Sequence, residues 1–322
     1  MKTTFLLAVV LPALMGTATV AVAQTPAVAH NTWSMGAPMP VAVKYGMAAA
    51  LCGKIYVIGG ITNSDITSNN QVYDPATNTW SSAKPIPQAT FAAAIATADD
   101  NWLTIAGGSV DGSTQTSATW SYNCKHDEWI NRDPMPTPRQ NMGAASEHGE
   151  IYVAGGYNAN GMLNTVERFY FVGNTWEELA PMSVAKSDLA VARMKTTIVA
   201  AAGLTEAGET GDNESYSNPW QSLAADPTAR SAVCSGSVKG ELYLAGGWNG
   251  ENSLNLTEAF NLKTNEWTTL ASMPQPVAAA TSVIYETVVD GVKNYTLYCF
   301  GGGDTTTPFQ GNVYSYVQIY QP

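Results

Sequence analysis

The sequence predicts an all-β protein in which six four-stranded blades form one closed ring, a six-bladed β-propeller. Two series of residues carry this prediction. Tryptophan recurs at a nearly constant interval, at Trp33, Trp80, Trp129, Trp176, Trp220 and Trp267. Glycine pairs recur with the same period, at Gly59-Gly60, Gly107-Gly108, Gly155-Gly156, Gly246-Gly247 and Gly301-Gly302, with Ala202-Gly203 as a relic in the fourth copy. The steps between these pairs run from 44 to 55 residues, which is typical of propeller blades rather than of helical repeats.

Within each repeat the residue types indicate four successive strands. The first strand consists of small residues, such as Ala48-Ala49-Ala50, because the innermost strands crowd around the axis. The second, such as 54–58, is almost continuously apolar, as expected for a strand covered on both faces. A glycine pair ends it, since glycine allows a positive φ and close approach of the backbone. Aromatic pairs seven residues apart, such as Tyr73 and Trp80, are predicted to pack between blades rather than to hold a cofactor.

The two ends of the repeat array predict how the ring closes. The sixth repeat has its glycine pair at 301–302 and an expected third strand around 313–316, but the chain reaches Pro322 without a further Trp. Trp33 supplies the missing position. We therefore expect the segment around Trp33 to form the outer strand of the last blade, which leaves no open sheet edge.

Residues 1–23 have the pattern of a secretory signal peptide. Lys2 gives a positive end, an apolar core follows from Phe5 to Met15, and Ala21-Val22-Ala23 precedes Gln24 as a small-x-small cleavage site. The apolar run is shorter than the ~20 residues of a membrane-spanning helix. The sequence thus predicts cleavage after Ala23, a secreted or periplasmic protein, no membrane span, and a single propeller domain over residues 24–322.

Charge and composition exclude several function classes. The net charge of −11 disfavours nucleic acid and anionic membranes as partners. The three histidines, His30, His126 and His148, fall in separate parts of the repeat, whereas a copper or zinc centre needs clustered imidazoles. Every glycine-rich stretch ends a strand and none opens a helix, so no phosphate loop is expected. We predict no metal, no cofactor and no catalytic set.

The four cysteines could form disulfides in three connectivities, and export to an oxidising compartment would permit them. The repeat places Cys52 and Cys234 in first strands, Cys124 near an outer turn and Cys299 in a second strand. Nothing in that register pairs them. We therefore expect four buried, unpaired thiols that behave as small apolar residues.

A glycine pair, a downstream Tyr as in Val72-Tyr73-Asp74-Pro75, and a Trp seven residues after that Tyr together resemble the kelch repeat. The resemblance covers roughly residues 31–322 and implies the propeller fold. It does not select a function, because kelch propellers include cytoskeletal adaptors, ubiquitin-ligase substrate receptors, secreted oxidases and sugar mutarotases. The kelch-type galactose oxidases hold copper with two His, two Tyr and a Cys joined to one Tyr, a set that this sequence lacks.

Candidate ligand-binding residues lie on loops that a propeller brings to one face: those joining strand four to the next blade, and strand two to strand three. Trp248 and Tyr157 directly follow glycine pairs, where packing does not demand an aromatic side chain, and aromatics flanked by amides suit a sugar ring or a peptide. They are the expected anchors. The remaining expected contacts are Asn158, Asn249, Asn141, Asp188, Arg139, Lys186, Arg230, Tyr45 and Glu206.

Two of these assignments have alternatives. Kelch repeats commonly carry Arg at the position of Arg139 and Arg230, so a structural role that braces loops is the favoured interpretation of both residues. The fourth blade has lost its glycine pair, and Glu206, Glu209 and Asp212 could form a site private to that blade.

Two functional classes follow. The first is an exported binding module that recognises a protein or a glycan on its loop face, without catalysis. The second is similar to the periplasmic sialic acid mutarotases, with Asp188 or Glu206 and Lys186 or Arg139 giving acid–base help to ring opening. The chain lacks the Gly-Glu followed by Gly-x-Arg pattern of that family, so we favour the binding module. The sequence does not indicate an oligomeric state.

Overall fold

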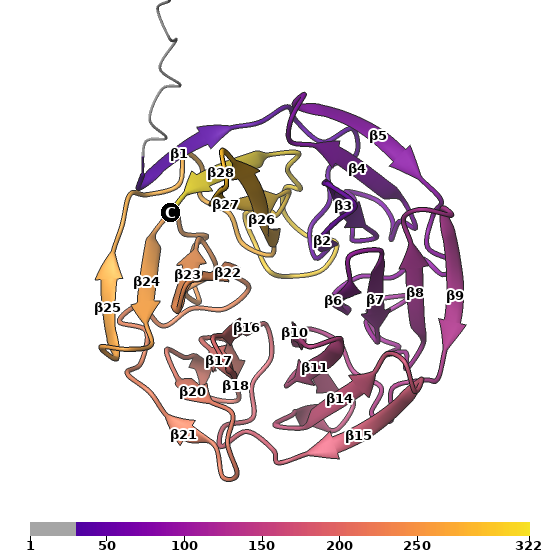
Figure 1. Ribbon diagram of the computed structural model, residues 1–322. Coiled ribbons are helices and arrows are strands. Elements are labelled where there is room, and N and C mark those ends of the chain that lie inside the picture. Colours follow the sequence, from indigo (N-terminus) through magenta and orange to yellow (C-terminus); the bar gives the residue numbers. More distant parts are fainter. Residues whose placement is uncertain (1–29) are drawn as a thin grey trace, which may run out of the picture.

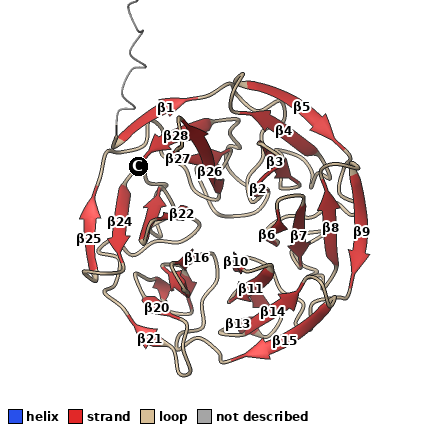
Figure 2. Ribbon diagram, in the orientation of Figure 1, coloured by secondary structure: helices blue, strands red, loops and turns tan. Residues whose placement is uncertain are grey.

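The computed structural model describes residues 30–322, and all of the regular structure in that range is β-strand. Figure 1 shows six four-stranded sheets around a central axis, with the first strand of each innermost and the fourth at the rim. Figure 2 shows the same ring without a helix among the described residues. The predicted six-bladed propeller is confirmed. The signal peptide expected over residues 1–23 and its cleavage after Ala23 lie outside the described residues.

The blades follow one another along the chain. Blade 1 contains β2 (Met47–Leu51), β3 (Lys54–Ile58), β4 (Asn70–Asp74) and β5 (Thr79–Ala83). Blade 2 contains β6 (Ala94–Asp99), β7 (Trp102–Ala106), β8 (Thr119–Asn123) and β9 (Glu128–Arg132). Blade 3 contains β10 (Gly143–Glu147), β11 (Glu150–Ala154), β14 (Val166–Tyr170) and β15 (Thr175–Leu179).

The second half of the ring repeats this order. Blade 4 contains β16 (Ala190–Met194), β17 (Thr197–Ala201), β20 (Asn213–Ser215) and β21 (Gln221–Ser222). Blade 5 contains β22 (Cys234–Val238), β23 (Glu241–Ala245), β24 (Thr257–Asn261) and β25 (Glu266–Thr269). Blade 6 contains β26 (Thr281–Val289), β27 (Val292–Phe300), β28 (Val317–Gln321) and β1 (Thr32–Met35). Two loop hairpins complete the set: β12 (Tyr157–Asn158) with β13 (Gly161–Met162), and β18 (Leu204–Thr205) with β19 (Gly208–Glu209).

The ring closes as predicted, with β1 as the outer strand of blade 6. β1 pairs antiparallel with β28, and Trp33 lies opposite Tyr320 with ring centroids 5.0 Å apart. The expected third strand at 313–316 is wrong by four residues. Val313 only forms a bridge to Gly303, and the strand begins at Val317, because the connection of this blade is longer than in the others.

Every Trp of the repeat makes the same contact with the preceding blade. The indole Nε1 of Trp80 donates to the carbonyl oxygen of Ala37 at 2.9 Å, and that of Trp129 to Lys84 at 2.9 Å. Each acceptor lies four residues after the previous Trp. The other four donor–acceptor pairs are Trp33 with Ala271, Trp176 with Asp133, Trp220 with Ala180 and Trp267 with Ala224. The Trp residues therefore recur at a nearly constant interval because the same inter-blade hydrogen bond recurs once per blade.

The apolar core is divided into six main clusters, one between each pair of neighbouring blades. The aromatic pairs predicted to pack there do so, and Tyr73 lies 5.0 Å from Trp80 and 5.9 Å from Phe300 of blade 6. At Gly143, near the axis, there is no room for a side chain. A Cβ at Gly143 in β10 would lie 2.4 Å from Cγ2 of Val191 in β16.

The expectation of four unpaired thiols is wrong for two of them. Cys52 and Cys124 form a disulfide, with their Cα atoms 6.4 Å apart. Cys52 lies in the turn after β2 rather than within the strand, and Cys124 lies in the turn after β8. Both turns project from the same side of adjacent blades, which the strand register alone did not reveal. Cys234 and Cys299 are buried and unpaired, as expected.

Candidate functional site at the axial mouth

The antiparallel order gives the ring two distinct faces. The loop face carries the connections from strand two to strand three and from each blade to the next. The hairpin face carries the turns between strands one and two and between strands three and four. The candidate site lies on the loop face, where the chain enters the innermost strands.

Six residues, one per blade, form an axial ring on this face: Tyr45, Ala92, Asn141, Asp188, Ala232 and Ala279. The N–H of each donates to the carbonyl oxygen of the ring residue in the preceding blade, at 2.8 to 2.9 Å, so the hydrogen bonds close on themselves. All six residues have φ between 51° and 57°. Asn and Asp adopt this left-handed conformation more readily than other non-glycine residues, whereas Tyr and Ala are held in it by the ring.

The ring encloses a small pocket of about 160 Å³, the axial mouth. Its polar side chains on the ring are Tyr45, Asn141 and Asp188, and the other three ring positions are alanine. The mouth is therefore polar on one side and lined by methyl groups on the other. Of the eleven sequence-predicted contacts, these three meet directly.

Asp188 is the charged group of the axial mouth. Its carboxylate accepts from Nδ2 of Asn141, and Oγ of Ser187 donates to its Oδ2 at 3.1 Å. Burial raises the pKa of Asp188 to about 6, the two hydrogen bonds oppose that rise, and the nearby Glu209 adds to it. No Lys or Arg among the described residues forms an ion pair with this carboxylate.

Asn141 and Tyr45 complete the polar side, and Tyr157 lies beside the mouth without lining it. Oδ1 of Asn141 is buried and has no hydrogen-bond partner among the described residues. Oη of Tyr45 donates to the carbonyl oxygen of Thr306 at 2.8 Å. Burial raises the pKa of Tyr157, and the negative charge of Asp188 raises it further.

Sequence reasoning missed two residues that position this site, Gln140 and Ser187. Nε2 of Gln140 donates to Oη of Tyr157 at 2.8 Å, and Ser187 contacts Asp188 as described above. Both directly precede a ring residue, and both form a bridge with the residue that follows the glycine pair, Gln140 with Tyr157 and Ser187 with Leu204. The repeat register contained that signal.

A long loop of blade 6 reaches across to blades 1 and 2 beside the mouth. Nζ of the buried Lys44 donates to the carbonyl oxygens of Thr307 and Gln310, each at 2.7 Å. The ring of Phe309 lies 6.4 Å from that of Phe91. Burial lowers the pKa of Lys44, and Asp304 partly opposes this.

The three predicted cationic contacts are not in the mouth. Arg139, Lys186 and Arg230 are fully buried, and each pairs with a carboxylate of the third strand of its own blade: Glu167, Glu214 and Glu258. Lys186 also contacts Asp212 at 2.6 Å, and Arg230 contacts Asp226 at 3.0 Å. Each of these three Glu residues lies 28 residues after its cation, a spacing that the sequence contained. The bracing role is thus the one that the geometry supports.

The other predicted contacts surround the mouth at a distance. Trp248 is partly exposed and forms bridges to Ser231 and Ser253, but it does not line the pocket. Asn249 accepts from the N–H groups of Glu251 and Asn252, which fixes its own loop. Nδ2 of Asn158 donates to the carbonyl oxygen of Pro138 at 3.2 Å. Oε1 of Glu206 accepts from the N–H of Met162 at 3.5 Å.

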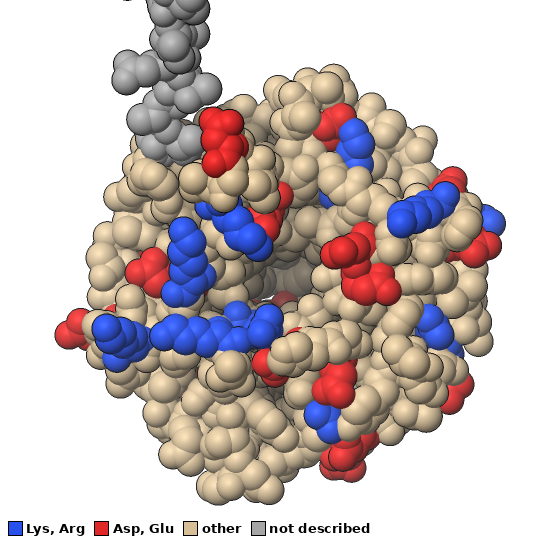
Figure 3. All heavy atoms as spheres, viewed as in Figure 1, with Lys and Arg blue, Asp and Glu red and all other residues tan. Residues whose placement is uncertain are grey.

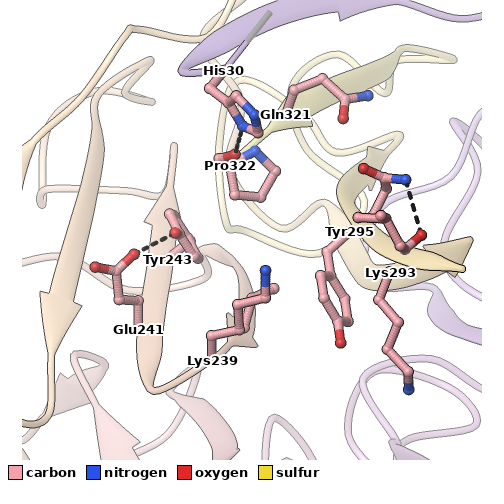
Figure 4. Close-up of a pocket in the computed structure, with 11 residues that line it drawn as sticks. His30, Lys239, Glu241, Tyr243, Lys293, Tyr295, Gln321 and Pro322 are labelled. Atoms are coloured by element: carbon pink, nitrogen blue, oxygen red, sulfur yellow. Dashed lines mark hydrogen bonds between the residues drawn. The ribbon is translucent and has the colours of Figure 1, made fainter. Parts of the chain in front are cut away.

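A larger pocket of about 420 Å³ lies on the hairpin face between blades 5 and 6 (Figure 4). Its polar groups already have partners. Oη of Tyr243 donates to Glu241 at 2.6 Å, Lys293 pairs with Glu286 at 2.8 Å, and the Lys239 ammonium lies 5.4 Å from the centre of the Tyr295 ring. It therefore offers fewer free polar groups than the axial mouth.

Two features are absent from residues 30–322. This range holds no group of three or more His, Cys, Asp and Glu side chains placed to bind a metal ion. It also contains no helix that is long and apolar enough to cross a membrane.

Comparison with known proteins agrees with the fold and its repeats. Residues 46–217 match the model of the KLHDC2/KLHL20/DRC7 Kelch-repeats domain, and residues 229–274 match the Kelch motif. The chain belongs to the kelch-repeat family. It is 28% identical over 309 residues to the kelch-like protein terF of Aspergillus terreus, covering 91% of this chain and 56% of that protein.

Two further relatives match over shorter regions. Kelch-like protein 40 of Xenopus laevis is 28% identical over 50% of this chain and 26% of its own length, and human kelch-like protein 23 is 26% identical over 68% and 39%. The kelch chain thus spans between about a quarter and just over half of the length of these relatives. A kelch propeller of this kind indicates a protein-binding module.

Proposed function

We propose that this protein is an exported kelch propeller that binds a protein ligand on its loop face, centred on the axial mouth. One observation carries the proposal. Tyr45, Asn141 and Asp188 stand at ring positions where the other blades have alanine, and the buried Oδ1 of Asn141 has no partner there. An unsatisfied buried acceptor costs free energy, so a ligand that donates to it would gain affinity.

Export is proposed on two grounds. Residues 1–23 have the pattern of a signal peptide, and the Cys52–Cys124 disulfide suits a compartment in which disulfides persist. Expression of the full chain should deliver protein outside the cytosol with Gln24 as its first residue. Mass spectrometry of the exported protein checks this, and retention of an intact leader would contradict it.

The glycan and mutarotase alternatives have less support. The amide oxygen of Asn249 and the amide nitrogen of Asn158 are already engaged within their own loops, which leaves fewer groups for sugar hydroxyls. The charged ends of Lys186 and Arg139 are buried in ion pairs. Neither can therefore supply the cation that acid–base help at the mouth would need.

Binding can be tested without knowing the natural ligand. A random peptide library is panned against the exported wild-type protein, and selected peptides are measured against an Asn141→Ala/Asp188→Ala variant. We expect binding to fall by about tenfold or more. A matched Asp99→Ala/Asp100→Ala variant, altered at a turn of the hairpin face, should bind normally. The reverse pattern would move the site to the hairpin face.

Trp248 is the proposed rim anchor of the same surface. A Trp248→Ala variant should lose about 2 kcal/mol of binding free energy, because the partly exposed indole contributes contact area to the ligand. Its melting temperature should change little. Equal binding of the selected peptides, or loss of the fold, would remove Trp248 from the site.

A further inference from the structure

The charged side chains exposed on the loop face are almost all acidic. The connections between strands two and three contain seven carboxylates and no Lys, Arg or His: Asp65, Asp111, Glu206, Glu209, Asp212, Glu251 and Asp304. The connections between blades do contain cations. Lys44, Arg139, Lys186 and Arg230 are fully buried, and only Lys84, which directly follows β5 at the rim, is exposed.

The other exposed Lys and Arg side chains of residues 30–322 lie on the hairpin face. Arg193, Lys195, Lys239 and Lys293 belong to the hairpins of blades 4 to 6. Figure 3 shows Lys and Arg side chains gathered over these blades on one side of the central opening. The turns of the hairpin face thus mix cations with carboxylates such as Asp99 and Asp100, whereas the connections of the loop face would attract a cationic partner.

Unlike the fully buried carboxylates of the third strands, the carboxylate in the axial mouth has no Lys or Arg partner among the described residues. The fully buried carboxylates Glu167, Glu214 and Glu258 each contact a Lys or Arg within the blade. Asp188 is partly buried, and its neighbours are Asn141, Ser187, Tyr45, Tyr157 and Glu209, none of which is cationic. The acceptor Oδ1 of Asn141 has no donor either.

The size of the mouth limits what can enter it. The mouth has a volume of about 160 Å³. That is enough for the end of one long side chain and too small for a helix or strand. The phenol of Tyr45 and the methyl groups of Ala232 and Ala279 can cover an aliphatic stem, since Lys and Arg bury their stems against apolar surface.

From these observations, and given the proposed protein-binding function, we infer that the partner presents a basic segment, one Lys or Arg side chain of which enters the axial mouth and pairs with Asp188. The ammonium or guanidinium would donate to the carboxylate and to Oδ1 of Asn141. The surrounding acidic loops would attract the remaining cationic residues of the segment and speed association.

The probes are two ten-residue synthetic peptide libraries of random sequence, one with Lys fixed at the centre and one with norleucine there. Wild-type protein should prefer the Lys library by about tenfold at low salt, and less at physiological ionic strength. In an Asp188→Asn variant this preference should fall below about threefold, because the carboxylate that pairs with the cation is gone. An Asp99→Asn/Asp100→Asn variant serves as the matched control and should keep the preference.

The outcomes separate this inference from the proposed function. If wild type binds both libraries equally, but binding still depends on Asn141, the loop face binds protein and the cation is not recognised. A Lys preference that survives Asp188→Asn also overturns the inference. Absence of binding by any peptide counts against the proposed function as well. If Asp188→Asn does not fold, a Glu209→Gln variant, which removes a more distant charge, should lower the preference by about twofold.

Discussion

At the scale of single residues, the site combines groups that work against the stability of the free protein. Four non-Asx residues of the axial ring are held at positive φ, and the carboxylate of Asp188 is partly buried without a cation. Strained and unpaired groups of this kind often mark sites that are completed by a ligand. The opposite holds for Asp111, whose carboxylate accepts from the N–H groups of Thr114 and Ser113.

The first prediction is that Asp188→Asn stabilises the free protein near neutral pH. Burial raises the pKa of Asp188 to about 6 from an ordinary value of 3.8. Below about pH 4 the carboxyl is protonated in both folded and unfolded chains. Between about pH 4 and 6 the unfolded chain loses the proton first, so the free energy of unfolding falls as pH rises, by up to about 3 kcal/mol. The variant should lack this loss, which thermal unfolding at pH 4 and pH 7 measures.

Asp111→Asn is the matched control because its pKa shift has the opposite sign. Backbone N–H groups of Thr114 and Ser113 lower the pKa of Asp111, so its contribution is present at neutral pH and lost as pH falls. The Asn variant should therefore be less stable than wild type at pH 7. An Asp188→Asn variant that is equally or less stable than wild type at pH 7 would contradict the assignment of an unpaired buried carboxylate.

At the scale of elements, the ring depends on contacts that repeat from blade to blade. The N–H of each Trp indole binds a carbonyl of the preceding blade, and the ring residues bind one another around the axis. β1 makes the last of these contacts, because Nε1 of Trp33 donates to Ala271 of blade 5 while β1 pairs with β28 of blade 6. Blade 6 is thus tied to its neighbour through a strand from the other end of the chain.

The second prediction concerns β1. Deleting residues 24–36 should expose the edge of β28 and remove the Trp33 contacts, so the melting temperature should fall by at least about 5 °C and the protein should aggregate. Differential scanning calorimetry and size-exclusion chromatography measure both effects. Met35→Ala, which trims an exposed side chain of the same strand, should leave both unchanged. A deletion variant with normal melting and elution would show that closure does not need β1.

Elements with a strict period could be predicted from the sequence, whereas side-chain partners could not. The Trp spacing identified the blades and the role of Trp33, because one hydrogen bond and one aromatic pair recur in each copy. The third strand of blade 6 was misplaced because its connection departs from the period. Register also brought Tyr45, Asn141 and Asp188 to one ring, but it did not reveal that the cations nearby are paired inward.

The sequence does contain a feature that indicates the burial of these three cations. Arg139, Lys186 and Arg230 each precede a Glu by 28 residues, and blades without a cation have no Glu at that place. Likewise, Asn158 and Asn249 each precede a short turn. Their side-chain oxygens accept hydrogen bonds from backbone N–H groups of that turn, which is common for Asn in loops. Exposure of a loop residue therefore did not make its polar atoms free for a ligand.

At the scale of the whole molecule, the disulfide and the proposed binding surface lie on opposite faces. The Cys52–Cys124 bond joins turns of blades 1 and 2 on the hairpin face, while the acidic loops and the axial mouth occupy the other. The disulfide can therefore stabilise the ring without restricting a ligand. The remaining thiols lie in the core between blades 5 and 6, where burial raises the pKa of Cys299 well above its usual value and keeps it protonated.

The last prediction is that the exported protein contains one disulfide and two free thiols, and that the disulfide stabilises the fold. Thiol counting on denatured protein should give two groups without reductant and four after reduction. The bond closes a loop with a sequence separation of 72 residues, so the Cys52→Ser/Cys124→Ser variant should lose about 4 kcal/mol of unfolding free energy, because its unfolded chain is less restricted. Reductant should lower the melting temperature of wild type and leave that of the double variant unchanged. Ligand binding by wild type and by the double variant should be the same. Four free thiols in the exported protein, or equal melting temperatures of wild type and the double variant, would show that the two turns are not linked.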